Sequence, residues 1–150
     1  MKITLTNRQR RVPLQLPWLR QCADAALLAV ENTEPGTGLS SWQSLSTIEV
    51  AIISDKVITR VHEDFLNDPT PTDVITFQHG ELLISADTAA HQARARNLPP
   101  EAEVLLYLVH GLLHLRGYDD HTDTDRQAMH ATQDALFETI LAQSPFPTTA

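Results

Sequence analysis

A nearly continuous apolar segment, residues 101 to 116, constrains the fold more than any other feature of this sequence. Pro99 and Pro100 suit the start of a helix, and Gly117 suits a left-handed C-terminal cap. Most sides of this helix are apolar, through Val104, Leu105, Leu108, Val109, Leu112, Leu113 and Leu115. A helix that is apolar on most sides belongs in a core, so we expect the other elements to pack around it.

The remaining segments predict four strands and four more helices. β-branched residues or alternating apolar residues mark strands at 2–6, 45–53, 73–77 and 81–85. Helical spacing or capping residues mark helices at 14–31, at 55–66, from Ser85 or Asp87 to Arg96, and from Thr122 to the residue before Ser144. Helix 55–66 carries an apolar stripe that we expect to be buried, formed by Val57, Ile58, Val61 and Phe65.

The order of these elements predicts an α+β fold. We expect a mixed four-stranded sheet, with the last two strands joined as a hairpin, surrounded by about five helices. The length of 150 residues suits a single domain covering residues 1–150. We expect the tail from about 144 to 150 to be frayed.

Composition narrows the class of protein. The apolar fraction is 42%, and no apolar run is long enough for a membrane span. The N-terminal residues contain no sustained apolar run, so we expect no signal peptide, and the one cysteine fits a reducing compartment, hence the cytoplasm. A net charge of −8 counts against a general nucleic-acid coat protein but leaves room for a nucleic-acid enzyme with a local basic patch.

One face of the apolar helix is polar. His110 and His114 lie four residues apart, so their imidazoles project from the same face and can converge on one ion. Neutral imidazoles suit zinc, copper, nickel or iron; alternatively, both histidines are core residues bonded to carbonyls. Gly117 ends the helix, and the turn after it supplies Asp119, Asp120 and His121 as further candidate ligands. Three protein ligands plus water is the usual catalytic zinc arrangement.

This pattern differs from that of the zinc peptidases. Those enzymes use HExxH, in which the glutamate is the general base, whereas this chain has Gly111 at that position. The sequence therefore disfavours a peptidase mechanism of that type.

Three blocks of the sequence resemble the YbeY family of bacterial endoribonucleases. The segment HGLLHLRGYDDH, residues 110–121, resembles the family signature HGxLHLxGYDH. PTDVITF at 71–77 and ELLISADTAAHQA at 81–93 resemble two further family segments, and the three blocks lie within a similarity that runs from about 46 to 136. The resemblance implies a four-stranded mixed sheet with one zinc ion per chain. It also implies single-strand-specific, metal-dependent endoribonuclease activity in small-subunit rRNA maturation and ribosome quality control. The implied partners are rRNA and the ribosome or its small subunit, without a membrane or DNA.

The resemblance implies His110 and His114 as metal ligands and catalytic residues. The third family ligand lies six residues after the second, at Asp120 in this chain, while His121 lies seven after. Met129 lies twelve residues after Gly117, as in the family, so no gap is needed and Asp120 takes the ligand position. An insertion would give that position to His121 instead.

One departure from the family concerns phosphate binding. The family carries an arginine where this chain has Leu66, and Arg60 and Arg116 are candidate substitutes. Arg116 could instead cap the negative end of its own helix. Two other functions therefore remain open: a metal-dependent hydrolase of another substrate, and a ribosome-associated factor with a structural metal. Four protein ligands, including His121, would favour the structural metal.

Overall fold

The computed structural model describes residues 1–68, 70 and 72–147 and shows the expected α+β fold. Its strands are β1 (Lys2–Asn7), β2 (Thr47–Ile53), β3 (Val74–Phe77) and β4 (Glu81–Ser85). Its helices are α1 (Leu16–Glu31), α2 (Asp55–Leu66), α3 (Ala86–Ala95), α4 (Pro100–Leu115) and α5 (Asp123–Gln143), with a short 3₁₀ turn at Trp42–Ser44. The described residues thus confirm four strands and five α-helices, with boundaries within a few residues of those predicted.

The sheet is mixed, as expected. Its strand order is β1-β2-β4-β3, in which β1, β2 and β4 run parallel and β3 is antiparallel to β4. The predicted hairpin of β3 and β4 is therefore confirmed, and its turn contains Gly80 at φ 100°. Within the described sheet, β3 is an edge strand, so one side of it remains open to the surroundings of the sheet.

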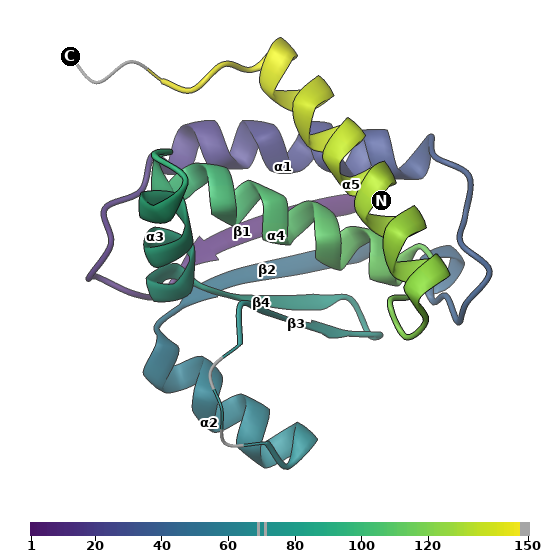
Figure 1. Cartoon of the computed structure of the whole chain (residues 1–150), viewed down its shortest axis with the longest axis horizontal. Helices are drawn as coiled ribbons and strands as arrows, with labels where there is room; N and C mark the ends of the chain where they lie inside the picture. The colour runs from purple at the N-terminus through teal and green to yellow at the C-terminus, as the bar shows by residue number, and fades with distance from the viewer. Residues whose placement is uncertain (69, 71, 148–150) are drawn as a thin grey trace.

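Helix α4 lies at the centre of the molecule. It packs between the sheet and the helices α1, α3 and α5, as Figure 1 shows. Its apolar residues are buried together with those of β2, β4 and α1 in one core. The prediction of a central helix is therefore confirmed, and the two histidines are carried by one of the most constrained elements of the fold.

Serine or threonine side chains cap the N-termini of three of the helices. Ser54 accepts a hydrogen bond from the Val57 amide at the start of α2, and Ser85 accepts one from the Thr88 amide at the start of α3. Thr122 caps α5 through the Asp125 amide, as the sequence predicts. A cap of this kind stabilises a helix by about 1 kcal/mol, so these residues help to fix where each helix begins.

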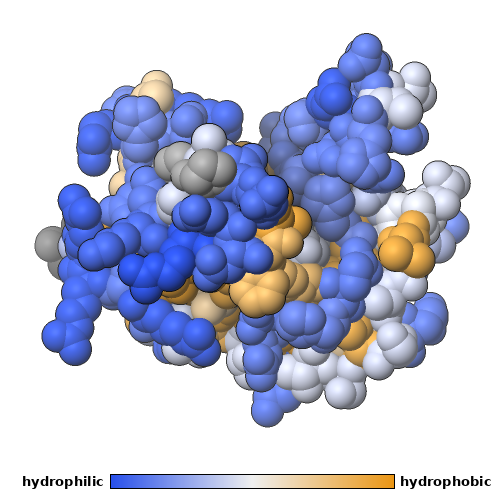
Figure 2. Space-filling view, turned by 90° about the horizontal axis from the view of Figure 1, so that it is seen from below, coloured by the Kyte–Doolittle hydropathy of each residue, from blue (hydrophilic) through white to orange (hydrophobic). Residues whose placement is uncertain are grey.

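The predicted buried stripe of α2 is only partly correct. Ile58 is fully buried and Val61 packs against the small core between α2 and the sheet, but Val57 is 44% exposed and Phe65 is 70% exposed. Helix α2 projects away from the sheet and makes its main contacts with β4 and α3 (Figure 1). Figure 2, seen from below, shows hydrophobic residues gathered in a hollow between hydrophilic surfaces on this side of the molecule.

The sequence predicts a frayed tail from about 144, and in the structure residues 144–146 lie against Trp18 of α1. The indole Nε1 of Trp18 donates to the carbonyl oxygens of Ser144 at 3.2 Å and Pro145 at 3.0 Å. The rings of Trp18 and Phe146 lie 5.3 Å apart, and Ser144 is buried. The apolar ring and two carbonyl acceptors therefore hold the tail against α1; residues 148–150 lie outside the described residues.

None of the helices in the described residues is both long enough and apolar enough to cross a membrane.

Candidate metal centre

His110 and His114 face one another from successive turns of α4. Their Nε2 atoms lie 3.1 Å apart. The Nδ1 atom of His110 lies 2.7 Å from Gln133 Oε1, and the Nδ1 atom of His114 lies 3.1 Å from the Tyr118 carbonyl oxygen. A carbonyl oxygen can only accept a hydrogen bond, so each Nδ1 is the donor. The two Nε2 atoms, which are the remaining ring nitrogens, point into the same space.

This arrangement answers the alternative that these are ordinary core histidines. Both histidines do bond to carbonyl oxygens, but only through Nδ1, which leaves the Nε2 atoms facing each other. Burial lowers the pKa of His110, which favours the uncharged form of this ring. An outer hydrogen bond from Nδ1, which both rings form, is usual for a metal-bound histidine.

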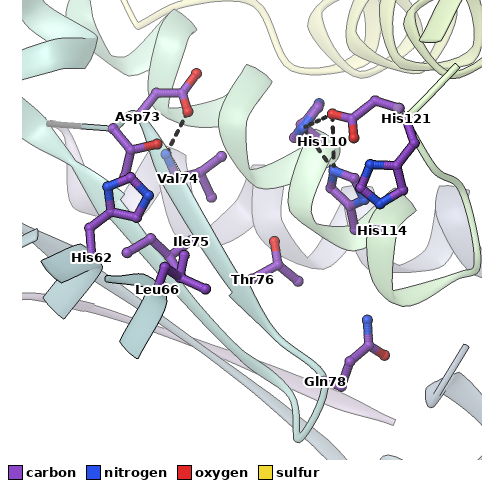
Figure 3. A pocket seen from close by; sticks show the side chains of 12 residues that line it. His62, Leu66, Asp73, Val74, Ile75, Thr76, Gln78, His110, His114 and His121 are labelled. Atoms are coloured by element: carbon purple, nitrogen blue, oxygen red, sulfur yellow. Dashed lines mark hydrogen bonds and ion pairs between the residues drawn. The ribbon is translucent and has the colours of Figure 1, made fainter. Parts of the chain in front are cut away.

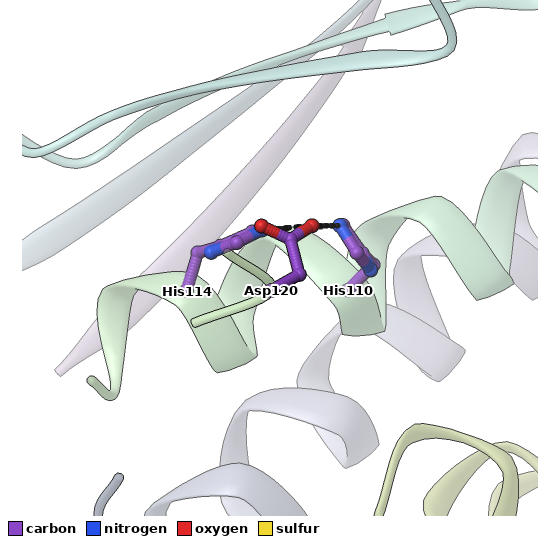
Figure 4. Close-up of side chains that lie close together, drawn as sticks. All are labelled: His110, His114 and Asp120. Atoms are coloured by element: carbon purple, nitrogen blue, oxygen red, sulfur yellow. Dashed lines mark hydrogen bonds and ion pairs between the residues drawn. The ribbon is translucent and has the colours of Figure 1, made fainter. Parts of the chain in front are cut away.

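Asp120 completes a three-residue cluster. Its Oδ2 lies 3.6 Å from His114 Nε2 and 3.9 Å from His110 Nε2, with the carboxylate over the gap between the two rings (Figure 4). One ligand atom from each of the three residues lies within 4.8 Å of the others. The structure therefore brings together the three residues that the sequence singled out.

His121 takes a different position. Its side chain is 85% exposed, and its Nε2 lies 3.3 Å from Asp119 Oδ1. The same Asp119 oxygen accepts a hydrogen bond from the Asp120 amide at 2.8 Å, so Asp119 fixes the backbone that presents the Asp120 carboxylate. Asp119, Asp120 and His121 also form a second, more exposed group of acidic and histidine side chains.

The turn that carries Asp120 is held by a distant segment. Gly117 has a φ of 102°, a conformation that favours glycine, and it ends α4 as the sequence predicts. The Gly36 amide donates to the Arg116 carbonyl at 3.2 Å, and the Gly38 amide donates to the Gly117 carbonyl at 2.8 Å. A Cβ at Gly38 would lie 2.9 Å from the Gly117 oxygen, so the two backbones approach more closely than side chains would allow.

Gly111 has a packing role that explains why the site has no adjacent glutamate. A Cβ at this position would lie 2.8 Å from Leu82 Cδ2 and 3.2 Å from Thr76 Oγ1. Gly111 therefore faces the β3–β4 hairpin and allows α4 to lie close to the sheet. A glutamate would not fit there, which agrees with the inference that no peptidase-type base is present at this position.

The cluster opens into a cavity of about 500 Å³, shown in Figure 3. Its walls come from α2, β3 and the segment before it, α4, and the turn after α4. They are formed by His62, Leu66, Thr72, Asp73, Val74, Ile75, Thr76, Gln78, His110, His114, Asp120 and His121. A ligand in this cavity would therefore reach the open side of the two Nε2 atoms along the free edge of β3.

The candidate phosphate-binding arginines do not line this cavity. Leu66, 56% exposed, does line it, whereas Arg60 is exposed elsewhere on α2. Arg116 donates to the carbonyl oxygens of Glu31 and Thr33 at 3.2 Å each, and its guanidinium lies 5.6 Å from the Trp42 ring centre. Arg116 therefore ties the end of α1 to the end of α4; it neither lines the cavity nor bonds to the carbonyls of its own helix.

Sequence reasoning missed two groups that orient the histidines: the Gln133 side chain and the Tyr118 carbonyl. Gln133 lies on α5, 23 residues after His110, and is buried. A buried polar residue on a helix is an unusual feature, but no spacing rule links it to a residue so distant in the sequence.

Comparisons with known proteins agree on one family. The family model described as Endoribonuclease YbeY matches residues 4–141. The Endoribonuclease YbeY of Geobacter metallireducens is 32% identical over 91% of this chain and 94% of its own. That of Chlorobaculum parvum is 36% identical over 89% of this chain and 99% of its own. The solution structure of TM1509 from Thermotoga maritima, 24% identical, has a similar fold, with a TM-score of 0.65 over 94% of this chain and 90% of its own. The family match and the identity over nearly full length show that this chain belongs to the YbeY endoribonuclease family.

Proposed function

We propose that this protein is a zinc-dependent endoribonuclease, formed as one domain over residues 1–150, that cleaves single-stranded RNA in the cytoplasm. We further propose that it acts in the maturation of small-subunit rRNA and in ribosome quality control, in association with the ribosome or its small subunit. Family membership supports the endoribonuclease activity. The observation that carries the metal dependence is the convergence of the two Nε2 atoms, 3.1 Å apart, with Asp120 Oδ2 at 3.6 and 3.9 Å from them.

The donor set fits zinc. Two imidazole nitrogens and one carboxylate oxygen, from His110, His114 and Asp120, match the three-ligand sets of catalytic zinc sites. When bound, zinc supplies Lewis acidity, which polarises a phosphate oxygen and lowers the pKa of a water. A carboxylate in place of a third histidine makes the site less positive, so we expect a less acidic water than in an all-histidine site.

The residues of this chain prepare the site in three ways. Gln133 and the Tyr118 carbonyl hold the two imidazoles in the tautomer that exposes Nε2. Asp119 accepts a hydrogen bond from the Asp120 amide, which helps to position the Asp120 carboxylate beside the two histidines. The cavity along β3 then leaves room for an RNA strand to approach on the side that protein ligands do not occupy. Pre-arranged ligands avoid the cost of ordering them when substrate binds.

A purely structural metal is less well supported. Such zinc sites are usually closed by four protein ligands, and His121 was the candidate for the fourth. Its imidazole is paired with Asp119 and is 85% exposed, while the cluster opens into a cavity. This geometry favours a site that keeps one position free for substrate or water.

The test combines metal content with RNA cleavage. The purified protein is expected to contain about one zinc per chain and to cut a single-stranded rRNA fragment in preference to a duplex. His114→Ala and Asp120→Ala should lose both zinc and cleavage. His121→Ala is the matched control from the same turn and should retain zinc.

Two outcomes would contradict the assignment. Full zinc occupancy in Asp120→Ala would remove Asp120 from the ligand set, and loss of zinc in His121→Ala would place His121 there instead. Cleavage that persists in His114→Ala would show that the activity does not depend on this metal centre. Product ends identify the nucleophile, because a 2′,3′-cyclic phosphate requires attack by the RNA 2′-hydroxyl.

A further inference from the structure

A second cavity, of about 300 Å³, adjoins the metal centre on the side of α3 and α5. Asp73 and His110 line both cavities, so the two spaces meet at the first histidine. The rest of its wall consists of Thr88, Gln92, Arg96, Glu103, Leu106, Tyr107, His130 and Gln133. Its volume is at the lower end of the range for small-molecule sites, and its wall is rich in hydrogen-bonding side chains around one leucine.

The charges around the two cavities single out one residue. An RNA strand brings one negative charge per phosphate, and proteins bind it chiefly through lysine and arginine. The wall of the larger cavity, as the structure describes it, contains no lysine or arginine. Arg96 is the one such residue among those lining the smaller cavity. Among the described residues, this guanidinium is therefore the one permanent cation that lines either cavity, in a chain of net charge −8.

Arg96 is anchored at one end and accessible at the other. Its NH1 lies 3.1 Å from Glu103 Oε1; the Glu103 side chain is 2% exposed, whereas that of Arg96 is 56% exposed. Guanidinium has five N–H donors in a planar fork, so one bond to a carboxylate leaves others free for a phosphate oxygen. The Glu103 carboxylate therefore orients the Arg96 guanidinium and partly offsets its positive charge.

The floor of the cavity offers neutral hydrogen-bonding groups. Tyr107 is buried, and burial together with the neighbouring Glu103 carboxylate raises the pKa of its hydroxyl, which stays protonated at neutral pH. Gln92, on α3, and Arg96, the residue that follows this helix, both line the cavity. A sugar or base beside the phosphate could therefore form hydrogen bonds with the uncharged side chains of Tyr107 and Gln92.

We propose that this second cavity binds the nucleotide next to the scissile bond, and that Arg96 donates to its phosphate. The proposal rests on the RNA-cleaving function proposed above and adds to it a binding site outside the metal centre. Arg96 is a positioning residue: it holds the strand so that the adjacent phosphate lies over His110 and His114.

The test uses steady-state cleavage of a fluorescent single-stranded RNA by the zinc-loaded protein at several salt concentrations. Arg96→Gln should raise KM about tenfold, the loss of one charge-assisted hydrogen bond, with kcat within a factor of two. The slope of log KM against log salt concentration should fall by about 0.7, the value for one phosphate of a single strand. Arg94→Gln is the matched control, since Arg94 is an exposed arginine of the same helix that does not line the cavity, and it should leave the salt slope unchanged.

A second variant separates binding from support of the fold. Glu103→Gln removes the charge that offsets Arg96, so it should lower KM about threefold even though it weakens the ion pair. If the pair served only the fold, Glu103→Gln would lower thermal stability without improving KM. Arg96→Lys retains a cation opposite Glu103 and should recover most of the salt slope.

The outcomes distinguish this proposal from the function on which it rests. If the wild-type protein cuts RNA and Arg96→Gln has the same KM and salt slope as Arg94→Gln, the second cavity is not a nucleotide site, and the proposed function stands. If Arg96→Gln lowers kcat but not the salt slope, Arg96 supports the metal centre and does not bind phosphate. If the wild-type protein does not act on RNA at all, the proposed function itself fails.

Discussion

The hydrogen bond between Gln133 and His110 provides a direct test of the metal centre. Gln133→Leu removes the oxygen that accepts from His110 Nδ1 at 2.7 Å, and the replacement side chain is of similar size in a buried position. The imidazole then loses the partner that fixes its tautomer, and its N–H donor is left without an acceptor at this point. Loss of such an outer partner usually weakens metal binding 10- to 100-fold, or about 1.4 to 2.7 kcal/mol.

A matched substitution should act in the opposite direction. Gln133→Glu keeps an acceptor oxygen at the same place and adds a negative charge, which makes the imidazole a stronger donor to the metal. We expect the zinc dissociation constant of Gln133→Glu to equal or fall below that of the wild-type protein. The order of affinities should therefore be Glu, then Gln, then Leu at position 133.

The assay is competition for zinc with a chromogenic chelator at fixed pH, accompanied by thermal unfolding of the metal-free proteins. The metal-free Gln133→Leu protein should lose only about 1 kcal/mol of stability, the usual net contribution of one hydrogen bond. Zinc affinity equal to that of the wild-type protein in Gln133→Leu would refute the reasoning, because the tautomer of His110 would then not depend on this bond.

Three further predictions concern packing and burial. Gly111→Ala places a methyl group 2.8 Å from Leu82 Cδ2; differential scanning calorimetry should show a Tm lower by several degrees, since overpacking costs about 1–3 kcal/mol and each kcal/mol shifts Tm by about 2–4 °C. Burial raises the pKa of Cys22 from 9.0 to about 11. The buried thiol therefore favours folding below pH 9 and loses that contribution as pH rises to about 11, and at pH 8 it should react with a disulfide reagent only after denaturant is added. Trp18→Phe removes the donor to the Ser144 and Pro145 carbonyls; limited proteolysis should then cleave the C-terminal tail faster than in the wild-type protein.

The sequence predicted the elements whose signals are local. The central helix, the β3–β4 hairpin and the caps at Ser85 and Thr122 depend on neighbours within a few residues, and the structure confirms each of them. Spacing along one helix was also enough to place His110 and His114 on a common face.

The differences between these predictions and the structure share a physical cause. A local sequence pattern does not identify the distant residue that packs or bonds against it. Phe65 lies on the apolar stripe of α2 and its ring meets that of Phe77 at 5.7 Å, but the side chain stays 70% exposed. The tail contains prolines and polar residues, a composition that predicts a frayed end. Its hydrogen-bond partner is distant in the sequence, since the Ser144 carbonyl accepts from Trp18, 126 residues earlier. Arg116 likewise bonds to carbonyls of α1 that no helix-capping rule could identify.

The contact between Gly36, Gly38 and Gly117 has a consequence for how this chain tolerates change. The signature segment contains all three candidate ligands, yet the backbone of the turn beyond Gly117 is braced by a segment about 80 residues earlier. A fragment that began after residue 40 would keep every candidate ligand and lose that brace. Substitutions at Gly36 and Gly117 should accordingly be epistatic: once Gly117 is replaced and the two backbones separate, replacing Gly36 should cost less, whereas the φ of 102° keeps its own cost at Gly117. The candidate metal centre therefore depends on two segments of the chain, and only the segment that contains His110, His114 and Asp120 has the sequence pattern of a metal site.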